Sequence, residues 1–258
     1  MSATAGLLAA LAIGLMAPCI GMFLVLRHRA FLGDGFAHIA LGGVALGLIA
    51  SISTTTTALV AGIIAALGIG WVSGRTKLPS DTIIMVFFAG SLSLAAILLS
   101  FAPAVDLEGL LFGNASNVTA ADLPLISGLA VIVLIVIAAV YRPLAFATFD
   151  SEAAQVGGVP VRALDYGLLV LTAVVVMSSI KITGLLLVAS LITVPAATAI
   201  MLGRGFARTA LLAGVISIAA VLGGTALSIA TGIDSGGVIV LLSVIVFFVV
   251  LPFRRIAV

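Results

Sequence analysis

The feature that most restricts the fold of this chain is a series of apolar runs that continue without interruption for about 20 residues, the length that a helix needs to cross a bilayer. Of its 258 residues, 63% are hydrophobic and only 8% are charged. A soluble domain carries about 25% charged residues, so this chain could not cover its surface with polar side chains. A membrane β-barrel would need alternating apolar and polar residues along strands of about 10 residues, and the continuous runs do not have that pattern. The sequence therefore predicts an all-α, polytopic protein of the cell (inner or plasma) membrane.

Nine apolar segments predict about eight to nine transmembrane helices in a single transmembrane domain, residues 1–258. They cover residues 5–26, 36–52, 56–73, 82–102, 122–141, 164–181, 183–201, 208–230 and 236–252. If the N-terminus lies outside, every Lys and Arg except Lys181 falls on the other side of the membrane, and four acidic residues fall on the outer side: Asp106, Glu108, Asp122 and Asp234. Cytoplasmic loops carry an excess of Lys and Arg, so this arrangement predicts an outer N-terminus and a cytoplasmic C-terminus.

Two connections between these segments are long enough to hold short helices. The outer connection, about 103–121, contains an apolar stretch at 107–114 that is too short to span and is predicted to lie on or dip into the membrane. In the inner connection, Asp150 suits the N-cap of a helix and Glu152 lies in its first turn, where the helix dipole favours a carboxylate. Gly157 and the following glycine end that helix, so a short cytosolic helix is predicted at about 149–158.

Asp34 and His38 are the acid and the histidine that share one of the predicted membrane helices. Their i, i+4 spacing places both side chains on the same face. Ionisable groups at membrane depth are costly and mark pathways for ions or substrates, and imidazole with carboxylate suits Zn²⁺, Mn²⁺ or Fe²⁺. Two ligands make an incomplete site, which water or a facing helix would complete. The alternative is structural: Asp34 caps the helix and His38 bonds a backbone carbonyl.

A second unusual segment, 184–199, contains a proline and several hydroxyl groups. Pro195 removes a backbone hydrogen bond from the predicted helix, and Ser190, Thr193 and Thr198 can satisfy freed carbonyls. A kinked span with these hydroxyl groups lines a transport pathway in one interpretation. In the other, the four residues serve only helix packing.

The chain lacks the motifs of an enzyme. It has no phosphate-binding loop of the G-x-x-x-x-G-K-[ST] type, no H-E-x-x-H zinc motif and no nucleophile elbow. We therefore expect a transport subunit that does not itself hydrolyse ATP, with no nucleic-acid partner.

Four blocks, taken together and in this order, resemble the permease subunits of ABC importers for divalent metals such as zinc, manganese and iron. The first joins Gly33-Asp34-x-x-x-His38 to the glycine-rich run 41–47. The other blocks lie at 109–114, 149–157 and 184–199, so the resemblance covers about residues 20–205. The family is often described with about eight spans, and the segment 232–237 lacks the proline expected after its acidic residue.

The resemblance implies a homodimer of permeases around a central pathway, two cytosolic ABC ATPase subunits, and an extracytoplasmic metal-binding protein. It implies transient metal contact at Asp34 and His38, and a coupling helix seated on the ATPase that includes Asp150, Glu152, Gln155 and Gly157. The metal would be a transported substrate, and no permanently bound cofactor is expected. Two other functions are kept as alternatives: an ion-coupled secondary transporter that uses Asp34 and His38 as a proton relay, and an ABC permease for a metal chelate or siderophore.

Overall fold

The structure is a computed structural model that describes residues 2–101, 111–113, 122–185, 187–202 and 205–253. Helices account for the regular structure in these ranges, and none of the described residues lies in a strand. The elements are α1 (Ser2–Leu26), α2 (Leu32–Ala50), α3 (Thr54–Ser73), α4 (Ser80–Leu99), α6 (Leu123–Phe149), α7 (Ser151–Val156), α8 (Val161–Thr183), α9 (Val188–Met201), α10 (Phe206–Thr231), α11 (Ser235–Val250) and the 3₁₀ turn η2 (Leu251–Phe253).

Each of the nine predicted apolar segments corresponds to a helix. Within the described ranges, seven helices are long and apolar enough to cross a membrane, namely α1, α2, α3, α4, α6, α8 and α10. The other two, α9 and α11, are apolar but have only 14 and 16 residues. At about 1.5 Å per residue, each is shorter than the roughly 30 Å hydrocarbon core. The prediction of an all-α polytopic membrane protein is confirmed, with seven spans by length and two shorter apolar helices.

The boundary between α8 and α9 differs from the prediction. The predicted segment 183–201 contains α9, but α8 continues to Thr183 and α9 begins only at Val188. Gly184 ends α8 because it adopts φ +77°, a backbone conformation that residues with a side chain rarely adopt. The short outer helix predicted at 107–114 lies mostly outside the described residues.

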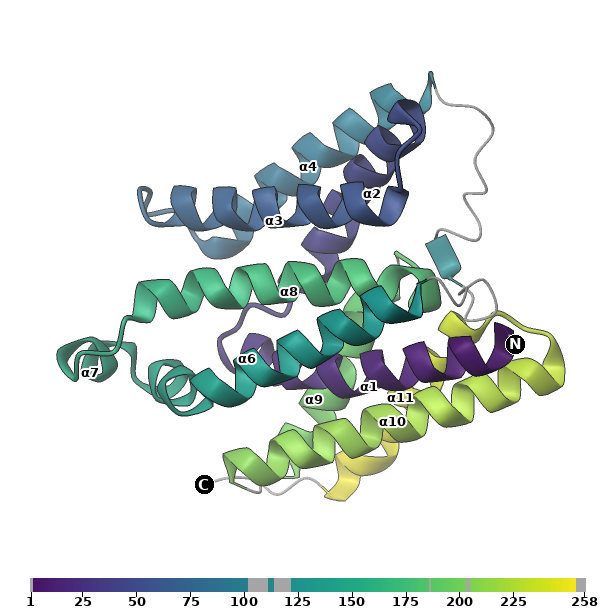
Figure 1. Cartoon of the computed structure of the whole chain (residues 1–258). Coiled ribbons are helices and arrows are strands. Elements are labelled where there is room, and N and C mark those ends of the chain that lie inside the picture. The colour runs from purple at the N-terminus through teal and green to yellow at the C-terminus, as the bar shows by residue number, and fades with distance from the viewer. Residues whose placement is uncertain (1, 102–110, 114–121, 186, 203–204, 254–258) are drawn as a thin grey trace.

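The helices pack in layers around α1 and α8. Figure 1 shows α2, α3 and α4 on one side of α8, and α1, α10 and α11 on the other. In the apolar stretches of α1, α2 and α8, 67% of the residues are buried, whereas in those of α4 and α6 only 17% and 22% are buried. Since α4 and α6 expose most of their apolar surface, they form the periphery that faces lipid or a second subunit.

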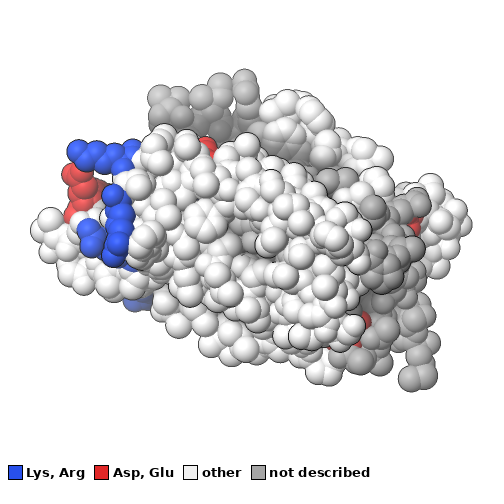
Figure 2. Space-filling view, turned by 90° about the horizontal axis from the view of Figure 1, so that it is seen from above, with Lys and Arg blue, Asp and Glu red and all other residues white. Residues whose placement is uncertain are grey.

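The ends of the molecule differ in charge. Figure 2 shows the Lys and Arg side chains of the visible face gathered at one end. In Figure 1, α1 begins at the opposite end of the bundle from the end where α3 finishes and α8 begins. This arrangement is the one that an outer N-terminus and a cytoplasmic C-terminus require, and the orientation itself stays a prediction.

Candidate functional site

The glycines of α2 bring three other helices against the helix that carries Asp34 and His38. A Cβ atom on Gly43 would lie 2.6 Å from the Cα of Ala58 in α3, and one on Gly35 would overlap Ile84 in α4. Gly33 packs in the same way against Ala189 at the beginning of α9. Close approach of this kind needs the smallest residues. The glycine-rich sequence around Asp34 and His38 therefore holds their helix firmly between α3, α4 and α9.

Asp34 and His38 lie on one face of α2, near its beginning. Phe31 is the N-cap of α2, so Asp34 is not the cap but a first-turn residue, where the helix dipole favours its carboxylate. His38 Nδ1 lies 3.0 Å from the backbone oxygen of Asp34 and 3.8 Å from its carboxylate Oδ1. The side chains of His38 and Asp34 are 21% and 36% exposed, which leaves both open to an ion.

The hydrogen bond of His38 decides which ring nitrogen is available. A backbone carbonyl can only accept, so Nδ1 donates its proton to Asp34, and in the neutral imidazole Nε2 keeps a free lone pair. The His38 ring also packs on the ring of Phe88 from α4, with centroids 4.5 Å apart. The hydrogen bond to a backbone carbonyl, which the sequence predicted as the alternative to a ligand role, is thus present. It leaves Nε2 available, so it does not exclude His38 as a metal ligand.

The described residues contain no cluster of three or more His, Cys, Asp or Glu side chains that could hold a metal ion. Asp34 and His38 therefore supply two ligands at most from one copy of the described chain. Zinc usually takes four ligands and manganese nearer six. Water or residues from another chain would have to complete the coordination, as a site that must release its ion requires.

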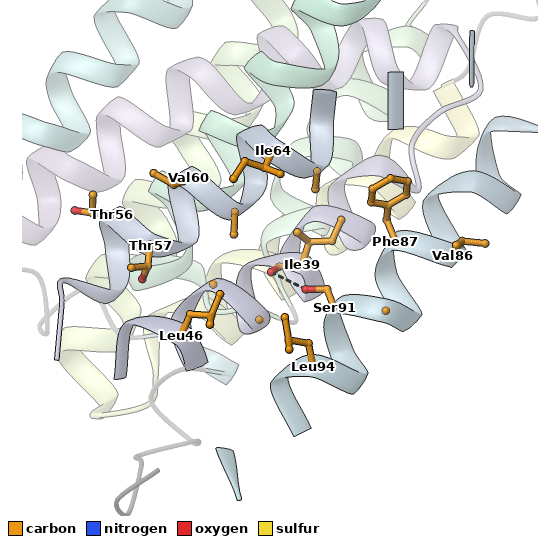
Figure 3. A pocket seen from close by; sticks show the side chains of 15 residues that line it. Ile39, Leu46, Thr56, Thr57, Val60, Ile64, Val86, Phe87, Ser91 and Leu94 are labelled. Atoms are coloured by element: carbon orange, nitrogen blue, oxygen red, sulfur yellow. Dashed lines mark hydrogen bonds between the residues drawn. The ribbon is translucent and has the colours of Figure 1, made fainter. Parts of the chain in front are cut away.

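A large hollow beside α2 is apolar and does not suit a cation. A cavity of about 610 Å³ lies between α3 and α4 above α2, and no charged side chain is among its described lining residues. Figure 3 shows Leu46, Val60 and Leu94 around it, and the Ser91 hydroxyl that donates to the Ile39 carbonyl at 3.1 Å. Ser91, the polar side chain that α4 contributes to the described lining, is thus already hydrogen-bonded. The lining suits a hydrocarbon chain.

Two of the four candidate pathway residues of α9 form hydrogen bonds within their own helix. Thr193 and Thr198 donate to the carbonyls of Ala189 and Val194 at 2.8 and 2.7 Å. Neither hydroxyl bonds the carbonyl four residues before Pro195, which is the one that the proline leaves without a donor. Pro195 and Thr198 are buried, whereas Ser190 and Thr193 are half-buried. Of the four, Thr193 lines a hollow of about 400 Å³ beside the end of α1.

The short inner helix has the predicted caps. The Asp150 carboxylate accepts from the Ala153 N–H at 2.8 Å, and Glu152 lies in the first turn of α7. Gly157 is the C-cap, and Gly158 follows it at φ +82°. Ala154 is fully buried against Ala147 of α6 and Val161 of α8. One face of α7 is therefore fixed to the bundle and the other is free.

The free face of α7 is apolar as well as polar. Val156 is 91% exposed and Phe149, just before the helix, is 70% exposed. Glu152 and Gln155 are exposed beside them. This mixture on the charged end of a membrane protein is typical of a surface that binds another protein.

Sequence reasoning missed a largely buried arginine that joins the helices around α7. The Arg27 side chain is only 9% exposed and forms an ion pair with Asp165 near the beginning of α8. Its Nε donates to the Thr148 hydroxyl near the end of α6 at 2.9 Å. Burial lowers the pKa of Arg27 and the Asp165 carboxylate raises it, yet a guanidinium remains charged in proteins. The available signal was Asp165, an acid inside a predicted apolar segment.

Comparison with known proteins gives the family. The ABC 3 transport family matches residues 2–254. The chain belongs to the ABC 3 transport family. It is 32% identical to the manganese transport system membrane protein MntC of Listeria innocua, over 96% of this chain and 89% of that protein. It is 34% identical to the manganese import system permease protein ScaB of Streptococcus parasanguinis, over 94% of this chain and 87% of that protein.

A solved structure shows the same fold. PsaBC from Streptococcus pneumoniae, in complex with Fab, matches with a TM-score of 0.85 at 29% identity, over 96% of this chain and 90% of that chain. The predicted family of divalent-metal ABC importer permeases is confirmed for this member of the ABC 3 transport family, as is its place in the membrane as a multi-pass protein.

Proposed function

We propose that this chain is the permease subunit of an ABC importer that moves a divalent transition metal ion into the cytoplasm, with manganese the favoured metal among manganese, zinc and iron. The observation that carries the proposal is the Asp34–His38 pair, in which the hydrogen bond of Nδ1 leaves Nε2 free beside a carboxylate. Manganese is favoured because the relatives MntC and ScaB are named as manganese permeases. An incomplete, open ligand set suits a substrate that must leave again.

The partners follow from the same family. Two copies of this chain would face each other across the pathway, two ATPase subunits would bind on the cytoplasmic side, and an extracytoplasmic protein would deliver the metal. The free face of α7 supports its role as the coupling helix, with Asp150, Glu152, Gln155 and Gly157 placed to form or shape the contact. The basic end of the bundle supports the orientation with the N-terminus outside and the C-terminus in the cytoplasm.

The structure offers a route from α7 to the metal ligands. The two helices that flank α7 are joined by Arg27, which binds Thr148 of α6 and Asp165 of α8. Arg29 lies 3.9 Å from the same carboxylate. Both arginines belong to the turn between α1 and α2, which ends one helical turn before Asp34. A movement of α7 imposed by the ATPase would thus reach the beginning of α2.

The test is manganese uptake by cells that carry this permease with its ATPase and binding protein. Asp34→Asn and His38→Gln each remove one ligand, and we expect each to reduce uptake at least tenfold, as losses around metal ligands commonly do. The matched control is His28→Asn, because His28 is exposed outside the helices at φ +55°, a conformation that Asn tolerates. Uptake within twofold of the parent in either ligand variant, at equal protein levels, would contradict the role of the pair.

Two further experiments separate this proposal from a secondary transporter and from a chelate permease. A secondary transporter would accumulate metal in proteoliposomes that contain the permease alone, whereas an ABC permease needs its ATPase and ATP. A chelate permease would show competition by metal chelates and none by free Mn²⁺ or Zn²⁺. We expect strict ATP dependence and competition by the free ions.

A further inference from the structure

A further cavity, of about 340 Å³, lies at the basic end of the molecule between the end of α3 and the beginning of α8. Three arginines from three segments line it: Arg29 from the α1–α2 turn, Arg75 after α3, and Arg162 in the first turn of α8. Neither proposed metal ligand, Asp34 or His38, lines this cavity, although Arg29 and Asp165 also belong to the proposed route from α7 to those ligands.

The positive charge of this cavity is not neutralised within the described part of the chain. Asp165 is the acid among the described lining residues, and its single carboxylate pairs both with Arg27, which does not line the cavity, and with Arg29, which does. Arg75 lies over the ring of Trp71, 4.2 Å from its centroid. Arg162 has no ion pair with any described residue. Three guanidinium groups around one small volume are the usual donors to a phosphate group.

Aromatic rings form the wall of the cavity. Trp71 and Tyr166 both line it, and the ring of Tyr166 packs against α3 at Gly70, where a Cβ atom would lie only 2.5 Å from the ring carbon Cε1. Trp and Tyr are enriched at the level where the bilayer meets water. The cavity therefore has the residue types of the head-group region, where positive charge and aromatic rings occur together.

An exposed apolar stripe leads from this cavity along α3. Val60, Ile64, Leu67 and Trp71 lie on one face of the helix, and they are 50%, 65%, 49% and 53% exposed. Val60 and Ile64 also border the large apolar cavity between α3 and α4 (Figure 3). A molecule with a phosphate at Arg75 and Arg162 and a hydrocarbon chain along this stripe would contact both surfaces at once. Free phosphate would use only the first.

We infer that this cavity binds the head group of an anionic phospholipid from the cytoplasmic leaflet, with an acyl chain along α3. Basic pockets between membrane helices on the cytoplasmic side recognise such head groups. The bound lipid would connect α3 to the turn between α1 and α2 through Arg29, which also lies beside Asp165. The site is independent of the proposed metal specificity.

The test measures lipid binding to the purified, delipidated full chain by native mass spectrometry. Phosphatidylglycerol and phosphatidylcholine with identical acyl chains are titrated against the parent, the double variant R75Q/R162Q, and the control R142Q/R208Q. Arg142 and Arg208 are exposed and do not line the cavity, and their substitution also removes two positive charges. We expect the parent and the control to prefer phosphatidylglycerol, and R75Q/R162Q to bind it about thirtyfold more weakly, at about fivefold per arginine near a membrane surface.

Several results would overturn the inference. One is the absence of a preference in the parent, and another is an equal loss in both double variants. Displacement of the lipid by millimolar inorganic phosphate would make this a free-phosphate site. Loss of the lipid when the ATPase subunits bind would show that protein covers it. If R75Q/R162Q does not fold, Arg162→Gln alone serves, since Arg162 is exposed, and an unchanged affinity in that variant would also contradict the inference.

Discussion

At the scale of single residues, two ionic groups near the beginning of α2 have different tasks. His38 and Asp34 remain open and bond each other only through Nδ1, so they can accept an ion. The Arg27 side chain is only 9% exposed, and its guanidinium is bonded to side chains of α6 and α8. The Asp34–His38 pair can therefore bind and release an ion, whereas Arg27 holds three helices together.

Arg27→Gln should destabilise the folded protein. The change removes the ion pair with Asp165 and the hydrogen bond to Thr148, and hydrogen bonds of charged groups contribute about 1.5–3 kcal/mol each. We expect a loss of about 3 kcal/mol or more in the free energy of unfolding, measured by denaturant titration in detergent. Arg142→Gln, an exposed change at the same end, should stay within about 0.5 kcal/mol of the parent.

A double-mutant cycle separates the ion pair from other effects of the substitution. If Arg27 and Asp165 act as a pair, Arg27→Gln with Asp165→Asn loses less stability than the sum of the two single variants. Strictly additive losses would show that the two residues stabilise the protein independently.

At the scale of elements, α9 is a short helix that depends on close packing. It contacts α1, α2, α8, α10 and α11 although it has only 14 residues. Gly21 of α1 allows this, because a Cβ atom there would overlap the carbonyl oxygen of Ile192. The neighbour is backbone, which cannot move aside as a side chain can. The contact between α1 and α9 therefore fixes the position of the whole helix.

Gly21→Ala should lower the yield of folded protein strongly, because overpacking of this kind typically costs about 1–3 kcal/mol or more. Fluorescence-detected size-exclusion chromatography in detergent would measure the folded fraction. The control is Gly128→Ala in α6, where nothing lies within 4 Å of the added methyl group. That variant should be neutral or more stable by about 0.5–1 kcal/mol, because Ala favours helices over Gly. Equal yields of the two variants would contradict the packing argument.

The exposed face of α7 gives the second element-scale prediction. Val156→Asp places a charge on a residue that is 91% exposed and should leave the permease folded. We expect it to weaken copurification of the ATPase at least tenfold, because a charge in an apolar interface must lose its water. Ile233→Asp, at a position before α11 that is 60% exposed, is the control and should copurify normally. Normal binding by the Val156 variant would remove α7 from the ATPase contact.

At the scale of the whole molecule, the charge asymmetry predicts the orientation in the membrane. Ser53 lies exposed between α2 and α3, and Ser151 lies exposed at the beginning of α7, at the basic end. In a Cys19→Ala background, an impermeant maleimide should label the Ser53→Cys variant in intact cells. The Ser151→Cys variant should be labelled only after permeabilisation. The opposite pattern would invert the topology and place α7 outside, where no ATPase could bind it.

The apolar segments and the short inner helix could be predicted because their causes are local. Hydropathy over about 20 residues decides whether a helix crosses the bilayer, and all nine segments are helical. The Asp150 cap needs only the Ala153 N–H three residues later. The late beginning of α9 could not be predicted, because the left-handed conformation of Gly184 depends on its neighbours: a Cβ atom there would overlap the backbone of Leu111 and Phe112.

The membrane class, the helices and the i, i+4 pairing of Asp34 with His38 follow from the amino-acid sequence, since each depends on residues within a few turns of one another. Their surroundings follow from how the helices pack. This packing places Phe88 of α4 against His38, Asp165 against Arg27 at a separation of 138 residues, and α8 beside α3 so that three arginines share one cavity. These contacts join segments far apart in the chain, and the composition of one segment contains no information about which other segment will pack on it.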